Sequence, residues 1–537
     1  MATDDLDRVR EQVGGETTDS RVSRPLVAVG FGVALLVLSP LVWLLLRAAA
    51  IEPSQAVELL TLPTTVDVTL NTLVLVAGVT TASLALGVPL AILTVQTDLP
   101  FRRFWTVTSA LPLVVPSYIG AFAFVSAFGP HGLLADLLGV ELPEIYGLHG
   151  TVFVLTLFTY PYVFLTTRAA LLSFDGTVVE AARSLNHTRW EAFKRVTLPQ
   201  ITPGIAAGAL LVALYALSDF GTPAIMQYDV FTRMIYNEFG ARRLDYASVL
   251  SLLLLAMALA ILAVESRINA GRDGAYVSRG ARRPGEIKLG KWKVPALLFC
   301  ALVATLCLLL PVGILLLWLV RGGSGYAAGG FSFEPSFAWN SVSLAAAAAA
   351  VCVVAALPLA YLSARSDDRI GSLPDRLSYV GYAVPGVVLG LALVYLGLRY
   401  VPFLYQSVLL LVFAYVVRFM PQAVGTTKSS LLQVDPSYVE AARSLGYPPL
   451  AAFRRVVLPL VAPGIVAGAA LVFLTTMKEL PATLMLRPTG FETFVTYIWL
   501  VRDAGYYGQA AIPALVLVAV SGLSMLVILG REKYDAT

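Results

Sequence analysis

Charged residues are scarce in this sequence. Asp, Glu, Lys and Arg together make up 13% of its 537 residues, whereas 58% are hydrophobic. Soluble domains carry about twice that charged fraction, so the composition excludes an ordinary soluble protein and indicates an integral membrane protein. The formal net charge is only +4. Nothing in this balance suggests nucleic acid as a partner.

Cysteine and histidine are equally rare, with three of each in the whole chain. Cys300, Cys307 and Cys352 lie in apolar segments. Their spacing is not typical of a disulfide framework or a zinc site, so we expect small buried side chains. The histidines are scattered in loops and form no catalytic group: His131, His149 and His187. The sequence therefore predicts no metal site and no cofactor.

An ATP-binding motif is missing as well. A phosphate-binding loop needs Gly-x4-Gly-Lys followed by Ser or Thr, and it follows a strand. The nearest match runs from Gly285 to Lys291, but Trp292 stands where the hydroxyl is needed, and an apolar segment follows. We interpret this stretch as the basic flank of a membrane span. The chain is expected not to be an enzyme, and ATP hydrolysis would come from separate subunits.

Long hydrophobic runs make up most of what remains. A membrane-spanning helix needs about 20 apolar residues. Twelve segments are candidates: 26–46, 69–95, 104–128, 150–167, 201–227, 247–264, 294–320, 340–362, 378–398, 406–427, 460–486 and 509–530. We therefore predict an all-α integral membrane protein with about twelve transmembrane helices in contact with membrane lipid.

The basic residues predict the orientation of these spans. With the N-terminus inside, cytoplasmic segments hold 28 of the 38 Lys and Arg residues and external loops hold seven. Cytoplasmic loops of membrane proteins are enriched in Lys and Arg. We therefore expect a cytoplasmic N-terminus. The polar stretch 1–25 is predicted to be a disordered tail, and 531–537 a second cytoplasmic tail.

One segment of the chain occurs twice. Residues 175–208 and 435–468 align without a gap and share 19 of 34 residues. Six predicted spans separate the copies, so both lie on the same side of the membrane in a parallel repeat of two six-helix halves. The predicted divisions are a first half at 26–265 with its core at about 65–265, a basic cytoplasmic linker at 266–293, and a second half at 294–530. Two such bundles facing each other would leave a pathway between them.

Each repeated loop predicts a short helix, a tight turn and a second helix. An aspartate can cap the first helix, and asparagine or glycine tolerates a left-handed turn after it. Proline is expected to end the second helix, because it cannot continue one. The first copy offers Asp175, a helix at 176–185, Asn186, a Thr188–Glu191 capping box and Leu198-Pro199; the second offers Asp435-Pro436, a helix at 436–445, Gly446, Pro448-Pro449 and Leu458-Pro459.

The pattern Glu-Ala-Ala-x3-Gly-x9-(Ile/Val)-x-Leu-Pro in these loops resembles the EAA loop of permease subunits of bacterial and archaeal ABC importers. The matching residues are Glu180, Ala181, Ala182, Asn186, Leu198 and Pro199, and in the second copy Glu440, Ala441, Ala442, Gly446, Leu458 and Pro459. Asn186 departs from the family's glycine but tolerates the same turn. The resemblance covers about residues 65–530.

This resemblance implies a type I importer permease fold in the cell membrane of a bacterium or archaeon, with both transmembrane subunits fused in one chain. It also implies that each loop is a coupling helix that docks into a groove of a cytoplasmic ATPase, so that two ATPase copies bind one chain. An extracytoplasmic solute-binding protein would deliver the cargo. The alternative explanation for the loops is a pair of amphipathic helices lying at the membrane surface.

Four ionisable residues fall within or beside the predicted spans: Asp219, Arg418, Lys478 and Glu479. Such residues are costly in a bilayer and usually face a cavity or a partner. Asp219 and Glu479 are equivalent in the repeat, each about 24 Å along its helix from the repeated Pro-Gly. Each precedes a predicted break, at Pro223 or Pro481. We predict that this pair lines the translocation path or its outer gate; the alternative is a structural hydrogen bond or ion pair for each carboxylate.

The segments that begin at Ser218 and Met477 are similar to those of the branch of this family that imports ferric iron. Permeases for thiamine and 2-aminoethylphosphonate are close relatives of that branch, so these cargoes stay open. An ion-driven secondary transporter also combines twelve helices with parallel halves, but it does not need twin docking loops. A membrane-embedded enzyme would need clustered His, Asp or Glu side chains, and a receptor that transports nothing would show no solute-dependent ATP hydrolysis.

Overall fold

A computed structural model describes residues 24–129, 145–173, 177–186, 188–270, 287–320, 333–365 and 369–531. Some predictions concern residues outside these ranges. They are the ones made for most of the 1–25 tail and of the 266–293 linker, for Asp175, His131 and His187, and for residues 532–537.

The described residues form helices, and an isolated parallel β-bridge joins Thr97 to Ile287. Nine helices within these ranges are long and apolar enough to cross a membrane, and the number rises to eleven if each of two sharply bent helix pairs is counted as one span. A shorter apolar helix over Gly508–Gly522 matches the last predicted span. The prediction of an all-α membrane protein with about twelve spans is confirmed.

The helices of the first half are α2 (Arg24–Ala49), α3 (Pro53–Thr61), α4 (Pro63–Gln96), α5 (Arg102–Ala110), η1 (Leu111–Val114), α6 (Ser117–Phe128), α8 (Gly147–Ser173), α9 (Thr177–Ser184), α10 (Arg189–Ala192), η2 (Phe193–Thr197), α11 (Leu198–Ser218), α12 (Gly221–Ile225), α13 (Phe231–Gly240) and α14 (Leu244–Ala270). Those of the second half are η3 (Gly290–Trp292), α15 (Lys293–Ala304), η4 (Thr305–Leu309), α16 (Leu310–Val320), α17 (Pro335–Arg365), α18 (Arg369–Ala383), α19 (Gly386–Arg399), η5 (Pro402–Leu404), α20 (Val408–Leu431), α21 (Pro436–Ser444), α22 (Pro449–Ala452), η6 (Phe453–Val457), α23 (Leu458–Met477), α24 (Pro481–Leu486), α25 (Phe494–Asp503), η7 (Tyr507–Ala510) and α26 (Ala511–Arg531).

The two halves pack in the same way. Three long helices contact one another in each, namely α4, α8 and α11 in the first half and α17, α20 and α23 in the second. Matching side chains also make matching hydrogen bonds. Asn71 Nδ2 donates to the Asp229 carbonyl at 3.0 Å, and Asn340 Nδ2 donates to the Glu492 carbonyl at 2.9 Å. The repeat in the sequence is therefore a repeat of tertiary contacts.

The first helix of each half packs against the other half. Helix α2 contacts α18 and α19, and Val37 and Leu44 are buried in a hydrophobic cluster that contains second-half residues. In exchange, α15 and α16 contact α5 and α6, and Cys300 and Cys307 are buried among first-half residues. All three cysteines are free and buried, as predicted. These exchanged helices hold the two halves together.

Prolines interrupt two matched spans. The segment of α5 and η1 meets α6 at 92°, and α18 meets α19 at 100°. Pro116 and Pro385 stand at the N-caps of α6 and α19, where the missing N–H of proline costs no helical hydrogen bond. Helices α11 and α23 also stop, at Ser218 and Met477, ahead of the short α12 and α24. The breaks predicted beside Asp219 and Glu479 are therefore present.

The repeated Leu-Pro does not end a helix, contrary to the prediction. A π-helical turn, η2 or η6, precedes it, and the helix then continues as α11 or α23. In this turn the Leu198 N–H donates to the Phe193 carbonyl, and the Leu458 N–H donates to the Phe453 carbonyl. Each bond reaches five residues back, and this wider turn relieves the clash that proline makes in a regular α-helix.

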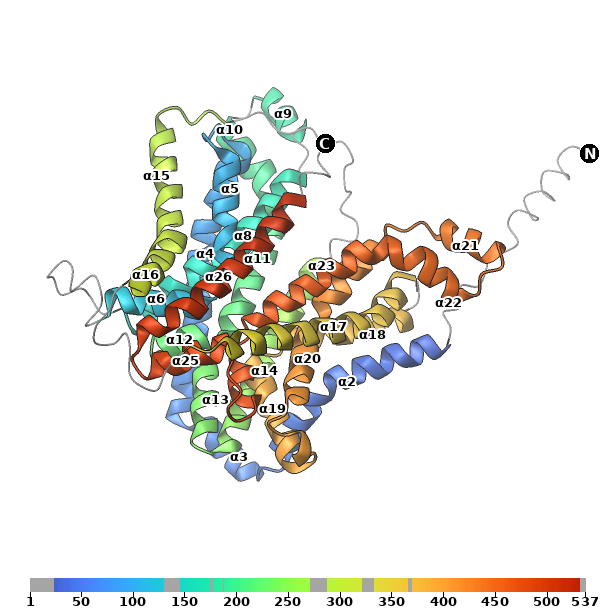
Figure 1. The fold of residues 1–537 in the computed structure, drawn as a ribbon. Coiled ribbons are helices and arrows are strands. Elements are labelled where there is room, and N and C mark those ends of the chain that lie inside the picture. Colours follow the sequence, from blue (N-terminus) through green and yellow to red (C-terminus); the bar gives the residue numbers. More distant parts are fainter. Residues whose placement is uncertain are drawn as a thin grey trace, which may run out of the picture.

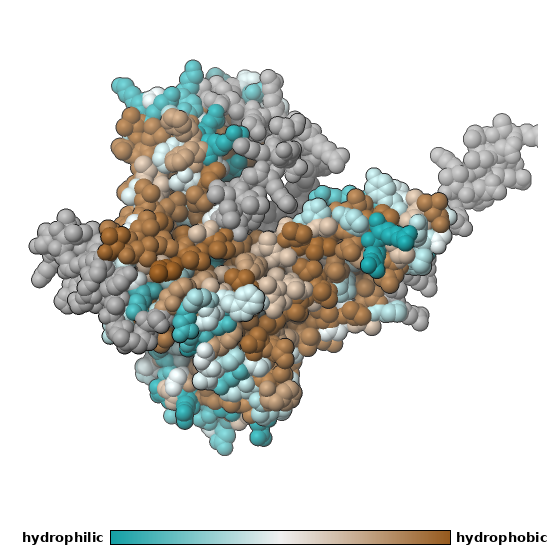
Figure 2. Space-filling model, in the orientation of Figure 1, coloured by the Kyte–Doolittle hydropathy of each residue, from teal (hydrophilic) through white to brown (hydrophobic). Residues whose placement is uncertain are grey.

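The outer surface is divided by polarity. Helices α9 and α21 lie at the ends of two separate arms, and α3 and α13 lie at the opposite end of the molecule (Figure 1). Figure 2 shows hydrophilic residues near the tip that carries α21 and α22 and near α13, with hydrophobic residues over much of the surface between them. This order is expected of a protein whose middle is surrounded by lipid.

Candidate functional sites

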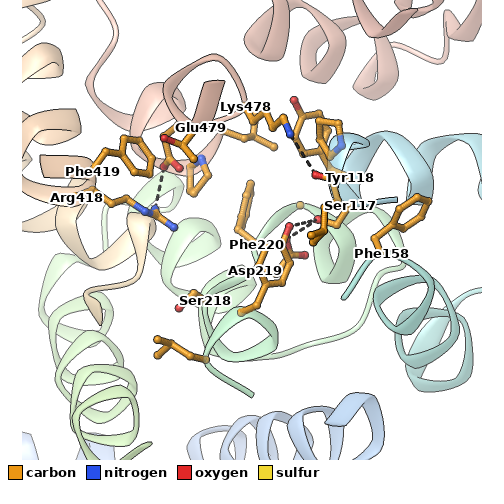
Figure 3. Close-up of a pocket in the computed structure, with 18 of the residues that line it drawn as sticks. Ser117, Tyr118, Phe158, Ser218, Asp219, Phe220, Arg418, Phe419, Lys478 and Glu479 are labelled. Atoms are coloured by element: carbon orange, nitrogen blue, oxygen red, sulfur yellow. Dashed lines mark hydrogen bonds and ion pairs between the residues drawn. The ribbon is translucent and has the colours of Figure 1, made fainter. Parts of the chain in front are cut away.

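A cavity of about 280 Å³ lies between the two halves. Its walls come from the breaks of the bent spans, from α8, α11 and α20, and from the residues that follow α11 and α23. All four ionisable residues singled out in the sequence line it: Asp219, Arg418, Lys478 and Glu479 (Figure 3). The fold therefore brings together charges that are up to 260 residues apart in the chain.

Asp219 follows the end of α11 and is held by neutral donors. Ser117 Oγ donates to Asp219 Oδ1 at 2.7 Å, and the Thr222 N–H donates to Oδ2 at 2.9 Å. Tyr215 donates its hydroxyl hydrogen to Ser117 Oγ at 3.2 Å. The carboxylate accepts from the first turn of α12, an interaction that the partial positive charge of a helix start favours. Its partners in the described part of the chain include no basic side chain.

Glu479 occupies the matching place in the second half and is held by a charge. Arg418 Nη1 donates to Glu479 Oε1 at 3.1 Å, and the Ala482 N–H donates to the same oxygen at 3.1 Å. Because the Glu479 side chain is only 6% exposed, this pairing offsets much of the cost of burying its charge. Gly386 makes room for the pair, since a Cβ there would collide with the Arg418 guanidinium.

The repeat is not symmetric at the cavity. Ser117 of the first half corresponds to Gly386 of the second, and Phe158 corresponds to Arg418. One acid is therefore held by a hydroxyl and the other by a guanidinium. The two differences depend on each other. A serine at position 386 would occupy the space that Arg418 needs, so the half that has the arginine has a glycine there.

Lys478 pairs with neither acid in the described structure. Its Nζ donates to the Leu113 carbonyl at 3.2 Å, across the interface between the halves (Figure 3). The first half has Ser218 at the equivalent position. Lys478 therefore adds a positive charge to the cavity wall that has no counterpart in the repeat.

The predicted path residues are placed as follows. Asp219, Glu479 and Pro481 line the cavity, whereas Pro223 is buried inside α12. Each carboxylate lines the cavity, as expected of a path residue, and also makes a hydrogen bond or ion pair, as expected of a structural residue. The contacts therefore agree with both interpretations of the sequence. A role in transport stays a prediction.

The tyrosines of the cavity wall were not predicted from the sequence. They are Tyr118, Tyr162, Tyr215 and Tyr382. Tyrosine is common in membrane helices, so composition alone does not mark these residues. One signal was available: Tyr215 lies four residues before Asp219 and therefore on the same side of the chain as it leaves α11. Within the described ranges, no three His, Cys, Asp or Glu side chains are grouped so as to hold a metal ion.

The repeated loops form the predicted helix–turn–helix. Asn186 has a φ of 68° and Gly446 a φ of 86°, so both turns use the left-handed conformation as predicted. Thr188 and Glu191 form the capping box: the Thr188 N–H donates to Glu191 Oε2 at 2.9 Å, and the Glu191 N–H donates to Thr188 Oγ1 at 3.3 Å. The two loops therefore share one backbone shape despite their different turn residues.

Helix α21 begins at a side-chain cap. Asp435 Oδ1 accepts the Ser437 N–H at 2.9 Å, as predicted, and Pro436 starts the helix. This backbone hydrogen bond lowers the pKa of Asp435 below its ordinary value, because it favours the ionised carboxylate; the Ser437 hydroxyl and Arg365 act in the same direction.

The two loops also present the same side chains to their surroundings. Exposed are Glu180, Ala181, Asn186 and Pro199 with Glu440, Ala441, Gly446 and Pro459; half-buried are Leu198 and Leu458; buried are Ala182 and Ala442. Just before each turn stands a leucine that is almost fully exposed, Leu185 at 76% and Leu445 at 79%. An exposed carboxylate followed five residues later by an exposed leucine, in both loops, is a surface suited to a protein partner.

Helices α11 and α23 connect the loops to the cavity. Each starts at the repeated Leu-Pro and ends beside the acidic residue. The 21 residues of α11 span about 30 Å at 1.5 Å per residue. Each loop is therefore connected to the cavity wall by a single helix.

The sequence matches a single protein family twice, over residues 83–270 and 356–531. That family is described as binding-protein-dependent transport system inner membrane component. The chain belongs to this family. Each matched stretch contains one repeated loop and one acidic residue of the cavity. The protein is thus a multi-pass permease subunit of an ABC importer, a class of subunit that is not itself an enzyme.

Relatives of this permease are named for different solutes. It is 31% identical to the Fe(3+)-transport system permease protein FbpB 2 of Haemophilus influenzae, over 91% of this chain and 94% of that protein. It is 25% identical to the ferric transport system permease protein FbpB of Actinobacillus pleuropneumoniae, over 87% and 71%. A probable molybdenum ABC transporter permease protein of Haloferax volcanii is 32% identical over 36% of this chain and 73% of its own length.

Proposed function

We propose that this permease couples ATP hydrolysis by two copies of a cytoplasmic ABC ATPase to solute passage through the cavity. The repeated loops support the proposal most directly. Each loop lies at the tip of an arm (Figure 1) and presents a carboxylate and an exposed leucine. Each also leads into a helix whose last turns line the cavity. Two sites of one geometry fit a dimeric motor whose closure draws the arms together.

The two ends of the molecule would then bind different partners. The loops carry basic residues near their second helices, which favours a cytoplasmic location for them and for the N-terminus in a bacterial or archaeal membrane. An extracytoplasmic solute-binding protein would dock at the opposite end, where α3 and α13 lie. In this proposal the ATPase is a separate subunit, so the permease does not need an ATP-binding motif of its own.

Asp219 and Glu479 belong to the path in this proposal. Both face the cavity, and both stand at the breaks where α11 and α23 end. We expect the combination Asp219→Asn with Glu479→Gln to lower the rate of ATP-driven uptake about tenfold or more while the protein still assembles, since charged groups in a span are usually functional. Unchanged uptake by a normally assembled double variant would remove these residues from the path.

Ferric iron is the proposed cargo. The two iron permeases cited above align with most of this chain, and carboxylate and tyrosine oxygens line the cavity. Thiamine, 2-aminoethylphosphonate or another small solute is the alternative. Uptake of radiolabelled iron should fall in a strain that lacks this chain and return when the chain is restored. If iron uptake is unchanged but uptake of another solute falls, the iron assignment is wrong and the importer assignment stands.

A second experiment distinguishes this importer from an ion-driven secondary transporter. Proteoliposomes that contain the chain with its ATPase and binding protein should take up solute only with ATP on the ATPase side, with or without an ion gradient. Replacing Glu180 and Glu440 by lysine should abolish this uptake. The matched control is Glu58→Lys, an exposed substitution on α3 at the other end, which should still co-purify with the ATPase, whereas the double lysine variant should not. Uptake driven by an ion gradient without ATP would contradict the proposal.

A further inference from the structure

A groove with two arginines lies at the end of the molecule opposite the repeated loops. It has a volume of about 190 Å³ and is bounded by α2, α14 and α19. Arg47 stands in the last turn of α2, which leads into α3, and Arg399 is the last residue of α19. Helix α14 starts at Leu244, shortly after α13. The groove is therefore near the level of α3 and α13 (Figure 1).

The walls of this groove are mostly apolar and lie next to the lipid-facing surface. The Leu398 side chain is 52% exposed, and on α2 the neighbours of Arg47 include Leu45 and Leu46, which are 56% and 44% exposed. Lipid tails are as apolar as these side chains, so exposed leucines of a membrane helix face lipid. The apolar lining of the groove consists of Leu244, Leu391, Val394 and Leu398.

Only one of the two arginines is paired with an acid. Arg47 Nη2 forms an ion pair with Asp245 Oδ1, and the Arg47 guanidinium carbon lies 5.6 Å from the centroid of the Tyr395 ring. Arg399 follows Tyr395 by one helical turn, is exposed, and has no ion-pair partner among the residues that the structure describes. Both positive charges are close enough to the Tyr395 hydroxyl to interact with it electrostatically. With Asp245, the two arginines leave a formal charge of +1.

The equivalent junction in the repeat is closed by a neutral pair. Arg47 and Trp318 each stand seven residues after the proline of their exchanged helix, and Tyr395 corresponds to Ser126. Trp318 Nε1 donates to Ser126 Oγ at 2.6 Å. An exchanged helix can therefore be held in place without any arginine. The two positive charges of the groove call for another explanation than packing.

Aromatic side chains mark the depth of the groove in the membrane. Trp43, one turn before Arg47, packs on Tyr400 with ring centroids 4.9 Å apart, and Tyr395 meets the other side of this group at 5.9 Å from Tyr400. Trp and Tyr gather at the level of the lipid headgroups. Basic pockets between membrane helices at that level are suited to headgroup phosphates. A lipid here would place its phosphate near the arginines and an acyl chain along the leucines.

We propose that this groove binds an anionic phospholipid, with the phosphate between Arg47 and Arg399. The formal charge of +1 complements a lipid of charge −1, such as phosphatidylglycerol, better than a zwitterionic lipid. Because α2 belongs to the first half and α19 to the second, the bound lipid would join the two halves at this end. None of the residues that line the groove lines the cavity. The inference therefore depends neither on the proposed cargo nor on the proposed ATPase coupling.

Native mass spectrometry of the purified full chain counts bound lipid directly. We expect the parent to retain phosphatidylglycerol in preference to phosphatidylcholine. Arg399→Gln should weaken phosphatidylglycerol binding about tenfold, as for loss of a hydrogen bond to a charged group. Arg47→Trp should weaken it as well, because it removes a charge and puts in the groove the side chain of the equivalent junction. The matched control is Arg267→Gln, which removes an exposed arginine from the other end of α14 and should bind lipid like the parent.

Thermal unfolding gives a second measurement. A ligand that binds the folded chain stabilises it, so phosphatidylglycerol should raise the melting temperature of the parent and of Arg267→Gln more than that of Arg399→Gln. Equal binding by the parent and both groove variants overturns the inference, and so does equal affinity of the parent for phosphatidylcholine.

Two further outcomes would assign the groove to another occupant. Labelled inorganic phosphate that is retained by delipidated parent chain and lost in Arg399→Gln would indicate a site for free anions and contradict the lipid. Normal lipid binding by Arg399→Gln, together with loss of the solute-binding protein from the assembled transporter, would make the groove part of that partner's docking surface and overturn the inference equally.

Discussion

At the scale of single residues, the second half places a buried ion pair in the cavity wall. The Arg418 and Glu479 side chains are 17% and 6% exposed. Removing one partner leaves the other charge buried and unpaired. We therefore expect Arg418→Met to lower the free energy of unfolding by about 3 kcal/mol, measured by thermal unfolding of the purified chain in detergent.

The matched control for that experiment removes both charges. Arg418→Met combined with Glu479→Gln should recover most of the lost stability, since no isolated charge is left in the protein interior. If the single variant is as stable as the parent, the ion pair contributes nothing and the cavity wall is more hydrated than its contacts indicate.

The rarity of ionisable residues in apolar segments made Asp219 and Glu479 predictable from sequence. Their hydrogen-bond partners were not. Ser117 lies 102 residues from Asp219, and serine is ordinary in a membrane helix. The contact of Gly386 with Arg418 likewise depends on how two separate helices cross.

At the scale of elements, the turn of each repeated loop depends on one left-handed residue. A β-branched side chain at a φ of 86° is strained by about 1–2 kcal/mol, so Gly446→Val should distort the loop. We expect it to reduce co-purification of the ATPase severalfold. Asn186→Gly is the matched control, because glycine adopts a φ of 68° freely, and it should co-purify normally. Equal recovery of ATPase by Gly446→Val would contradict the proposed role of the turn.

The Asp435 cap predicts that the stability of the first turn of α21 depends on pH. The pKa of Asp435 is lowered in the folded chain from an ordinary value of 3.8. Its ionised cap therefore stabilises the helix fully above about pH 4, and this contribution is lost as the pH falls through the lowered pKa. Hydrogen-exchange protection of the first turn of α21 should be constant near neutral pH and decrease in strong acid. Asp435→Asn should lack that dependence.

The helical elements were largely predictable, but one type of junction was not. Span length, the capping residues and the left-handed turns follow from local chemistry. The Leu-Pro prediction failed because it assumed an α-helix, in which proline collides with the carbonyl four residues earlier. A π turn in each copy avoids that collision, and no residue type in the loop signals such a turn.

At the scale of the whole molecule, the sequence does not predict that the first helix of each half packs against the other half. The repeat and the distribution of basic residues predicted two parallel halves. They do not tell which half a terminal apolar helix packs against, because either half offers a hydrophobic surface. The contacts of α2 with α18 and α19 of the second half decide it.

Two neighbouring leucines of α2 test this exchange. Leu44 is 1% exposed and Leu45 is 56% exposed. Leu44→Ala should lower the free energy of unfolding by about 2–5 kcal/mol, because it leaves a cavity between the halves. Leu45→Ala, which faces outward, should change it by less than about 0.5 kcal/mol. Similar effects of the two substitutions in thermal unfolding would show that α2 does not pack as described.

The central claim is that force from an ATPase enters the permease at two equivalent loops. The most direct measurement is cross-linking of the assembled transporter through a cysteine placed at position 180 or 440, by Glu180→Cys or Glu440→Cys. The native cysteines are buried, so the introduced thiol is the accessible one. We predict that each variant captures the ATPase subunit and that Glu58→Cys, at the opposite end, does not. Capture by neither loop, in a complex that still transports, would contradict the account.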